Sequence, residues 1–340
     1  LISAADKGQT ACLQLLLNGK ANINATSNDG NTALIKAADQ GHTDCLQLLL
    51  DNEADIDAAG NCGDTALIRA ARLGQTGCLQ LLLDAKANIN AKDEDGDTAL
   101  ISVGAQGYPD CLHILLDAKA DIDAASQSGL TALMLATLND QSECLRMLID
   151  AKANLEAVDA YGDTALIFAA MEGHTDCLQL LLNAKADVNV ETTNGRIAAI
   201  VAAGQGRTAC LHLIIAAKAN INVEHENCGS ALIAAVTEGQ IECLRLLMDA
   251  KANIEAKNEY GYPALIIAAK DGRKECLQIL LDAKVNVDLL GPYGDTALTE
   301  ATSNGHPACL QLLIEAKANM EATTVDNDAA SVIAADEGQT

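Results

Sequence analysis

The chain has 340 residues, 49% of them hydrophobic, but aromatic side chains make up only 2% and Trp is absent. A net charge of −25 is opposite to the basic footprint that nucleic acids and anionic membranes attract, so it favours a protein partner with basic or apolar surface. No apolar run approaches the roughly 18 residues of a membrane span, and we expect no direct membrane insertion.

Cysteine reveals the organisation of the chain. Ten of the twelve cysteines recur every 33 residues, at positions 12, 45, 78, 111, 144, 177, 210, 243, 276 and 309. A fixed period of 20 to 50 residues indicates stacked repeats. We therefore expect residues 1–340 to form a single array of about ten repeats. The pattern is cut within a copy at both ends, which predicts a parent chain that extends beyond Leu1.

One copy, from Gly162 onward, shows the expected elements in chain order. Thr164 is a candidate N-cap for a short helix over 165–171, which Gly173 ends. A second helix is expected over 177–182, so rich in Leu that it must be buried on more than one side. Residues 186–195 then read as a loop or the tip of a β-hairpin.

Comparison of the copies identifies positions with fixed geometry. Alanine stands at all ten equivalents of Ala165, which indicates a close helix contact. Glycine holds ten of eleven turns between the paired helices, with Asp140 as the exception, and this pattern predicts a positive φ there.

The pattern resembles the ankyrin repeat. Thr65-Ala66-Leu67-Ile68 stands where that family has Thr-Pro-Leu-His, and Gly41-His42 and the run 87–91 match its turn and hairpin. The resemblance implies an all-α ankyrin-type repeat solenoid, with a helix-turn-helix plus a β-hairpin or loop per copy. It also implies protein recognition on the concave side rather than enzymatic activity.

The family's glycine after the second helix is replaced by lysine in nine copies and by Glu53 in a tenth. A non-glycine residue in the left-handed region costs roughly 1–2 kcal/mol. We therefore predict that the second helix, or a 3₁₀ turn, extends over 84–86 and the equivalent residues.

The remaining candidates for chemistry favour structural roles. The cysteines in register are one repeat apart, too far for disulfides, and no Cys-x-x-Cys spacing occurs, so they are expected to be small buried hydrophobes. Cys62 and Cys228 lie off register at tips, where they are either reactive or ordinary tip residues. The acidic run 93–97 lacks the spacing of a calcium loop. We predict no catalytic residue, cofactor or metal, and the free thiols favour the cytoplasm or another reducing intracellular compartment.

A candidate partner surface follows from the first helix. The residue after Ala-Leu-Ile and the one three positions later share a helix face, and these columns turn apolar in the middle of the chain. With the hairpin tips, the predicted partner-binding residues are Leu130, Leu135, Leu138, Tyr161, Phe168, Met171, Val201 and Ile267. They would hold an apolar segment with a basic rim. Two alternatives stay open. These side chains pack against their own hairpins, or the array is a structural or regulatory segment of a larger assembly or of a longer multidomain chain whose activity, such as that of a catalytic domain, lies outside these residues.

Overall fold

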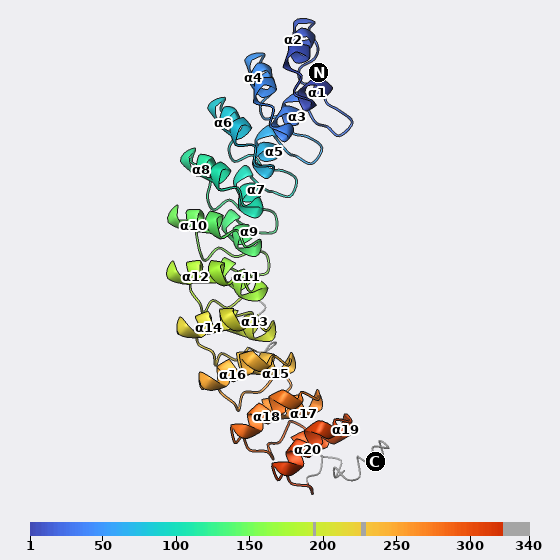
Figure 1. The fold of residues 1–340 in the computed structure, drawn as a ribbon, viewed down its shortest axis with the longest axis vertical. Helices are drawn as coiled ribbons and strands as arrows, with labels where there is room; N and C mark the ends of the chain where they lie inside the picture. Colours follow the sequence, from blue (N-terminus) through green and yellow to red (C-terminus); the bar gives the residue numbers. More distant parts are fainter. Residues whose placement is uncertain (193–194, 226–228, 322–340) are drawn as a thin grey trace. The chain divides into compact units, whose positions relative to one another are not determined.

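The computed structural model describes residues 1–192, 195–225 and 229–321. Within these residues lie twenty helices in pairs, one pair per copy (Figure 1), as the resemblance predicted. The first helices are α1 (Ile2–Asp6), α3 (Ala33–Gln40), α5 (Ala66–Arg72), α7 (Ala99–Gln106), α9 (Ala132–Leu138), α11 (Ala165–Glu172), α13 (Ala198–Gly204), α15 (Ala231–Thr237), α17 (Ala264–Lys270) and α19 (Ala297–Ser303). The second helices are α2 (Thr10–Asn18), α4 (Thr43–Asp51), α6 (Thr76–Asp84), α8 (Pro109–Asp117), α10 (Ser142–Asp150), α12 (Thr175–Asn183), α14 (Thr208–Ala216), α16 (Ile241–Asp249), α18 (Lys274–Asp282) and α20 (Pro307–Glu315).

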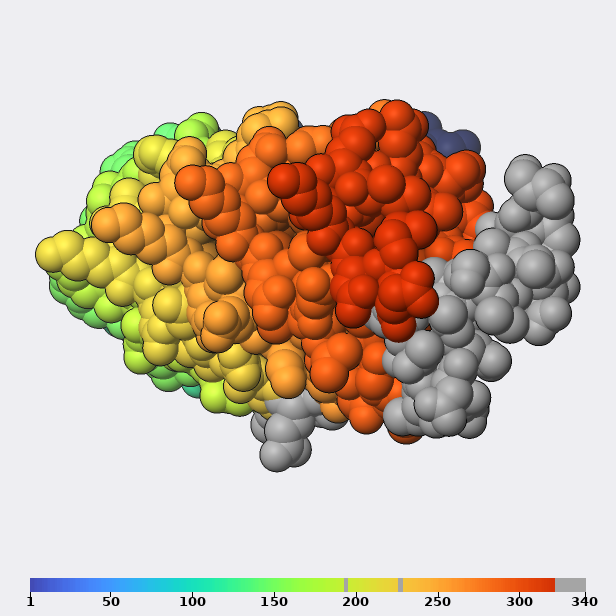
Figure 2. All heavy atoms as spheres, turned by 90° about the horizontal axis from the view of Figure 1, so that it is seen from below, coloured from blue at the N-terminus to red at the C-terminus, as the bar shows by residue number. Residues whose placement is uncertain are grey.

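The chain divides into two compact units. Unit 1 comprises Leu1–Phe168 and Asn183–Ala186, and unit 2 comprises Ala169–Leu182 and Asp187–Thr340. Within unit 1, first helices α1 to α9 pack in one layer and second helices α2 to α10 in another (Figure 1). Unit 2 repeats this arrangement, and Figure 2 shows its surface from the side of the last described copy, with α20 (red) foremost.

In most copies the N-cap residue of the first helix is Thr or Ser, and its side-chain hydroxyl caps the helix. Thr65 Oγ1 accepts a hydrogen bond from the backbone N–H of Ile68 at 3.3 Å, which satisfies one of the donors left free in a first turn. Thr164, the predicted cap, bonds Ile167 in the same way. Ile197 and Pro263 occupy this position without a side-chain cap bond.

The turn between the paired helices has the predicted left-handed conformation. In the described copies its φ lies between 63° at Gly8 and 85° at Gly173, and Asp140 follows with φ 56°. At Gly41 a Cβ would also stand only 2.2 Å from the Gln75 side chain. Glycine is therefore favoured here both by φ and by the close approach of the next copy.

The prediction that the second helix extends through the lysine column is wrong. All nine lysines and Glu53 have φ between 60° and 72°. After α6, Lys86 N–H donates to Leu83 O and Ala87 N–H to Leu82 O, both at 3.0 Å. These two bonds form a Schellman motif, and they offset the roughly 1–2 kcal/mol that the left-handed conformation costs a lysine.

The segments between copies are loops held by side chains rather than strands. In the described residues only three isolated β-bridges occur, at Ala125 with Thr131, His225 with Gly229 and Lys257 with Pro263. Instead, Asp57 Oδ1 accepts a hydrogen bond from Asn88 N of the next copy at 2.9 Å. The same bond recurs along the loops, for example from Asp121 N to Asn90 Oδ1 at 3.0 Å. We call this series the Asx ladder.

The side chains that follow the turn glycine also join consecutive copies. Gln75 Nε2 donates to Asp39 O at 3.3 Å, Arg207 Nε donates to Met171 O at 3.0 Å, and His306 Nε2 lies 2.9 Å from Lys270 O. Each of these carbonyls lies in the last turn of the first helix of the preceding copy. The turn side chains thus satisfy the helix-end carbonyls that would otherwise lack partners.

Candidate partner-binding surfaces

The first helices and the hairpins present one face in each unit, which we call the first-helix face. It carries the side chains at the positions of Lys36 and Asp39 in each copy, together with the hairpin tips. Its chemistry differs along the chain, from charged to apolar, as the sequence columns predicted.

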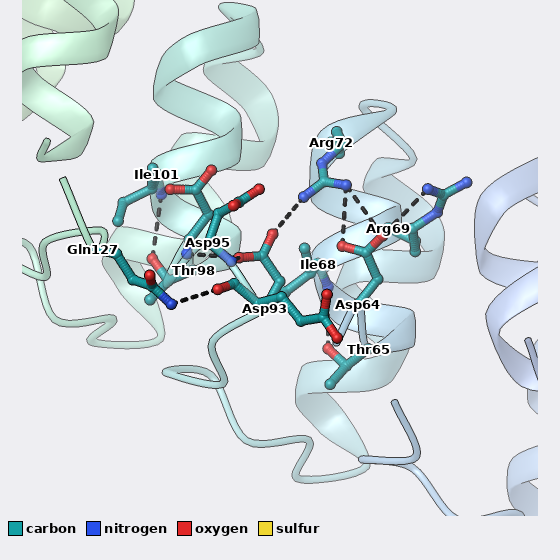
Figure 3. Close-up of polar contacts among 12 residues, drawn as sticks. Asp64, Thr65, Ile68, Arg69, Arg72, Asp93, Asp95, Thr98, Ile101 and Gln127 are labelled. Carbon is teal, nitrogen blue, oxygen red and sulfur yellow. Dashed lines mark hydrogen bonds and ion pairs between the residues drawn. The ribbon is translucent and has the colours of Figure 1, made fainter. Parts of the chain in front are cut away.

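The charged part of this face in unit 1 is a network of two arginines from α5 (Figure 3). Arg69 Nε donates to Asp39 Oδ1 at 2.7 Å. Arg72 Nη1 lies 3.0 Å from Asp64 Oδ1, and its Nη2 donates to Asp93 Oδ2 at 2.7 Å. The hydrogen bond to Asp39 is the main reason why the pKa of Arg69 is raised. Both guanidinium groups are therefore paired within the protein, and the network holds three consecutive copies together.

Asp93 also organises its own acidic tip. Its Oδ1 accepts hydrogen bonds from the backbone N–H groups of Asp95 at 3.0 Å and Asp97 at 2.8 Å. Burial, and then the charge of Asp93, raise the pKa of Asp97. Throughout the part of the chain that the structure describes, no group of three or more His, Cys, Asp or Glu side chains is arranged to hold a metal ion.

The apolar part of the face in unit 1 holds five of the residues predicted from the sequence. Leu135 and Leu138 lie half-buried on α9, and Leu130 is half-buried just before it. Tyr161 is 62% exposed at a hairpin tip, whereas Phe168 is only 6% exposed. Phe168 therefore presents little of its side chain to a partner.

Unit 2 has a groove on its first-helix face, made of two adjoining pockets that share Thr237, Asn258 and Tyr260. The first pocket has a volume of about 460 Å³, and the second about 440 Å³. Apolar lining of the first pocket comes from Met171, Ile200, Val201, Ile233 and Ala234. Met171 and Val201 were predicted from the sequence. Ile267, also predicted, lies in the lining of the second pocket but is only 5% exposed.

The second pocket combines tyrosines with charged groups. Tyr262 Oη donates to Asp295 Oδ2 at 3.3 Å, and burial raises the pKa of Tyr262 to about 12. Lys270 Nζ lies 4.8 Å from the centroid of the Tyr262 ring and 3.9 Å from Glu300 Oε2. Burial raises the pKa of Glu300, and the charge of Lys270 opposes that shift.

Sequence reasoning noted Tyr260, Tyr262 and Tyr293 as tip residues further along the chain but left them out of the predicted partner-binding set. It did not identify Ile200, Ile233, Lys270 or Asp271. One signal was available: Tyr260 and Tyr293 are 33 residues apart, so they occupy the same tip position in consecutive copies.

The cysteines in register are part of the core. They are free and buried from Cys45 to Cys309, while Cys12 in the first copy and Cys62 at a tip are exposed. Burial raises the pKa of Cys78 and of Cys144 to about 11, so these thiols stay protonated near neutral pH. Cys228 lies outside the described residues.

No helix in the described ranges has the length and apolar character needed to cross a membrane. A family model described as ankyrin repeats (three copies) matches residues 1–93, 57–126, 100–192, 184–258 and 232–326. Among solved structures, the crystal structure of the human ASB11 ankyrin repeat domain is similar, with 23% sequence identity and a TM-score of 0.59. The match covers 64% of this chain and 98% of that one, and at this identity it concerns the fold alone. A comparison with curated protein sequences finds no match.

Proposed function

Because the chain belongs to the ankyrin repeat family, whose repeats are generally protein–protein interaction modules, we propose that it is a non-enzymatic scaffold that binds a protein partner on its first-helix face. The observation that carries this proposal is the unit 2 groove. It offers two adjoining pockets of about 460 Å³ and 440 Å³ with apolar walls and a polar rim, the composition typical of sites that bind peptide segments.

The partner is proposed to insert an apolar segment flanked by basic residues. Half-buried Met171 and Val201 supply apolar contact in the first pocket. Glu238 and Glu259 outnumber the one cationic residue, Arg196, in the lining of the same pocket, and the whole chain has a net charge of −25. Cationic residues on the partner would therefore be attracted to the rim. The free cysteines favour a reducing intracellular compartment for this interaction.

Leu130, Leu135, Leu138 and Tyr161 form a separate candidate contact surface in unit 1. Leu135 and Tyr161 are the residues to truncate there. Phe168 is unsuitable as a probe, because replacing a side chain that is 6% exposed by alanine is expected to destabilise the fold by about 3–5 kcal/mol.

The proposal is tested by selecting short random displayed peptides on the full chain and measuring the affinity of the selected peptides. In unit 2, Val201→Glu puts a charge into the first pocket and is expected to weaken binding by about tenfold or more, since the charge must be desolvated beneath the peptide. Leu213→Glu is the matched control, because Leu213 is also half-buried but lies on second helix α14.

Circular dichroism would establish that both variants keep their helices. Selection of no peptide at all, or equal affinity for the two variants, would overturn the assignment of the groove as the binding surface.

A further inference from the structure

Tyrosine is concentrated in the second pocket of the unit 2 groove. Three of the five tyrosines of the chain line it: Tyr260, Tyr262 and Tyr293. Tyr260 is 67% exposed and Tyr293 63% exposed. Large aromatic surfaces that face a pocket rather than the core are available for stacking with a ligand.

The pocket also has an excess of negative charge. Asp271 lines it, and Glu259, which lines the adjoining first pocket next to Tyr260, raises the pKa of Tyr260. Asp295 and Glu300 contact two of its lining residues, Tyr262 and Lys270 respectively. Two cationic side chains, those of Lys270 and Arg273, accompany these four carboxylates. Lys270 pairs with Glu300, and Arg273 Nη2 donates to the carbonyl of Thr237 at 2.9 Å.

The Lys270 contacts show which chemistry this pocket stabilises. A cation lies over the Tyr262 ring while a carboxylate neutralises it from the side. Exposed Tyr260 and Tyr293 line this pocket with Asp271, and Glu259 precedes Tyr260 in the chain, so together they offer the same combination to a ligand. An anionic ligand would meet the surplus of carboxylates, and a purely apolar one would leave them without a partner on burial.

We propose that the second pocket binds an arginine side chain of the partner segment, the apolar residues of which occupy the adjoining first pocket. The guanidinium stacks on the rings of Tyr260 and Tyr293 and pairs with Asp271 or Glu259. Arginine fits better than lysine because its planar group stacks on aromatic faces and is more weakly hydrated than an ammonium. This inference rests on the proposed function, since it names a residue of the segment that the groove would hold.

The test uses the peptides selected on the full chain. We expect arginine to be enriched at one position of these peptides. Replacing that arginine by citrulline, which keeps the shape and removes the charge, should weaken binding by about tenfold, through loss of the cation–π contact and the ion pair. The double variant Tyr260→Ala/Tyr293→Ala should weaken binding of the arginine peptide similarly and bind the arginine and citrulline peptides equally.

Leu15→Ala is the control, because it truncates a large side chain that is 71% exposed on second helix α2 of unit 1, outside the candidate contact surfaces. It should leave both the affinity and the preference for arginine unchanged. Peptides that bind in the groove, lose affinity on Val201→Glu and tolerate citrulline would overturn the arginine pocket while leaving the proposed function intact. Failure to select any peptide would overturn both.

Discussion

Lysine occupies a left-handed backbone position after the second helix in nine copies, where glycine would be free of steric strain. Lys119, exposed with φ 65°, is a suitable test site. Lys119→Gly removes a strain of roughly 1–2 kcal/mol and adds less than that in backbone entropy of the unfolded chain, so we expect a net gain of about 0.5–1 kcal/mol. The midpoint of urea unfolding measures it. Gln278→Gly, at an exposed position in the interior of helix α18, should instead lose about 1 kcal/mol. Equal losses in both variants would contradict the argument.

Asp97 is a carboxyl group whose burial disfavours its charged form and raises its pKa above the ordinary 3.8. Because the pKa of Asp97 is higher in the folded state, its ionisation destabilises the fold. This loss of stability is complete once the pH is above the folded-state pKa, and it is absent below the ordinary pKa of 3.8. Asp97→Asn should therefore raise the free energy of unfolding at pH 7, as read from the urea midpoint. The gain should be less than about 1 kcal/mol, because the group is partly solvated. The gain should vanish near pH 3. Asp95→Asn, at the exposed tip of the same loop, is the control. A gain that persists at pH 3 would assign the effect to the amide itself.

The N-cap residue of helix α13 is Ile197, which supplies no cap bond. The N-cap of α15 in the same unit is Ser230, whose Oγ accepts a hydrogen bond from Ile233 N at 3.4 Å. A missing cap costs about 1 kcal/mol, and stability in a repeat array depends mainly on neighbouring copies. The core residue at the position of Leu232 is also smaller in α13, where it is Ala199. We predict that backbone amides of Val201–Gly204 exchange with solvent faster than those of Ala234–Thr237. Hydrogen exchange that places α13 among the best protected helices would refute the prediction that this copy is locally less stable.

The Asx ladder has a gap at Glu255. Asn253 N bonds Asn222 Oδ1 in the preceding copy, and Asn319 N bonds Asp288 Oδ1, both at 2.8 Å. Within the described residues no such bond joins Asn286 N to Glu255, whose side chain is one methylene longer. Glu255→Asn should complete the ladder and raise stability by about 1 kcal/mol, as read from the urea midpoint. Glu255→Gln, which removes the charge but keeps the length, should give no gain, and an equal gain would point to charge rather than to the ladder.

Sequence analysis predicted correctly those features for which the same residue type recurs at the same position in many copies. The N-cap at Thr164, the start of its helix at Ala165 and the positive φ of the turn glycines each rest on a repeated column. The lysine φ was mispredicted because strain was weighed without the two Schellman hydrogen bonds that offset it. The groove could not be read from one copy, since its walls come from helices and tips of several. Burial of Phe168 and Ile267 likewise depends on how neighbouring segments fill the space around a large side chain.

At the scale of the whole molecule, the net charge of −25 acts beyond any single pocket. A field of one sign steers a cationic partner toward the protein and raises the rate of association, whereas desolvated contacts in the groove mainly set the rate of dissociation. The two effects are separable by salt, because the screening length falls from roughly 30 Å at 0.01 M to roughly 3 Å at 1 M.

We therefore predict that the association rate constant of an arginine-containing selected peptide falls at least about tenfold between these salt concentrations, while its dissociation rate constant changes by less than about threefold. Surface plasmon resonance or stopped-flow fluorescence measures both constants. In the same experiment, Val201→Glu should act mainly on dissociation, because it alters the groove and adds only one charge to a strongly acidic surface. If salt changed chiefly the dissociation rate, the contacts would be exposed ion pairs, and the net charge would play no part in bringing the partner to the groove.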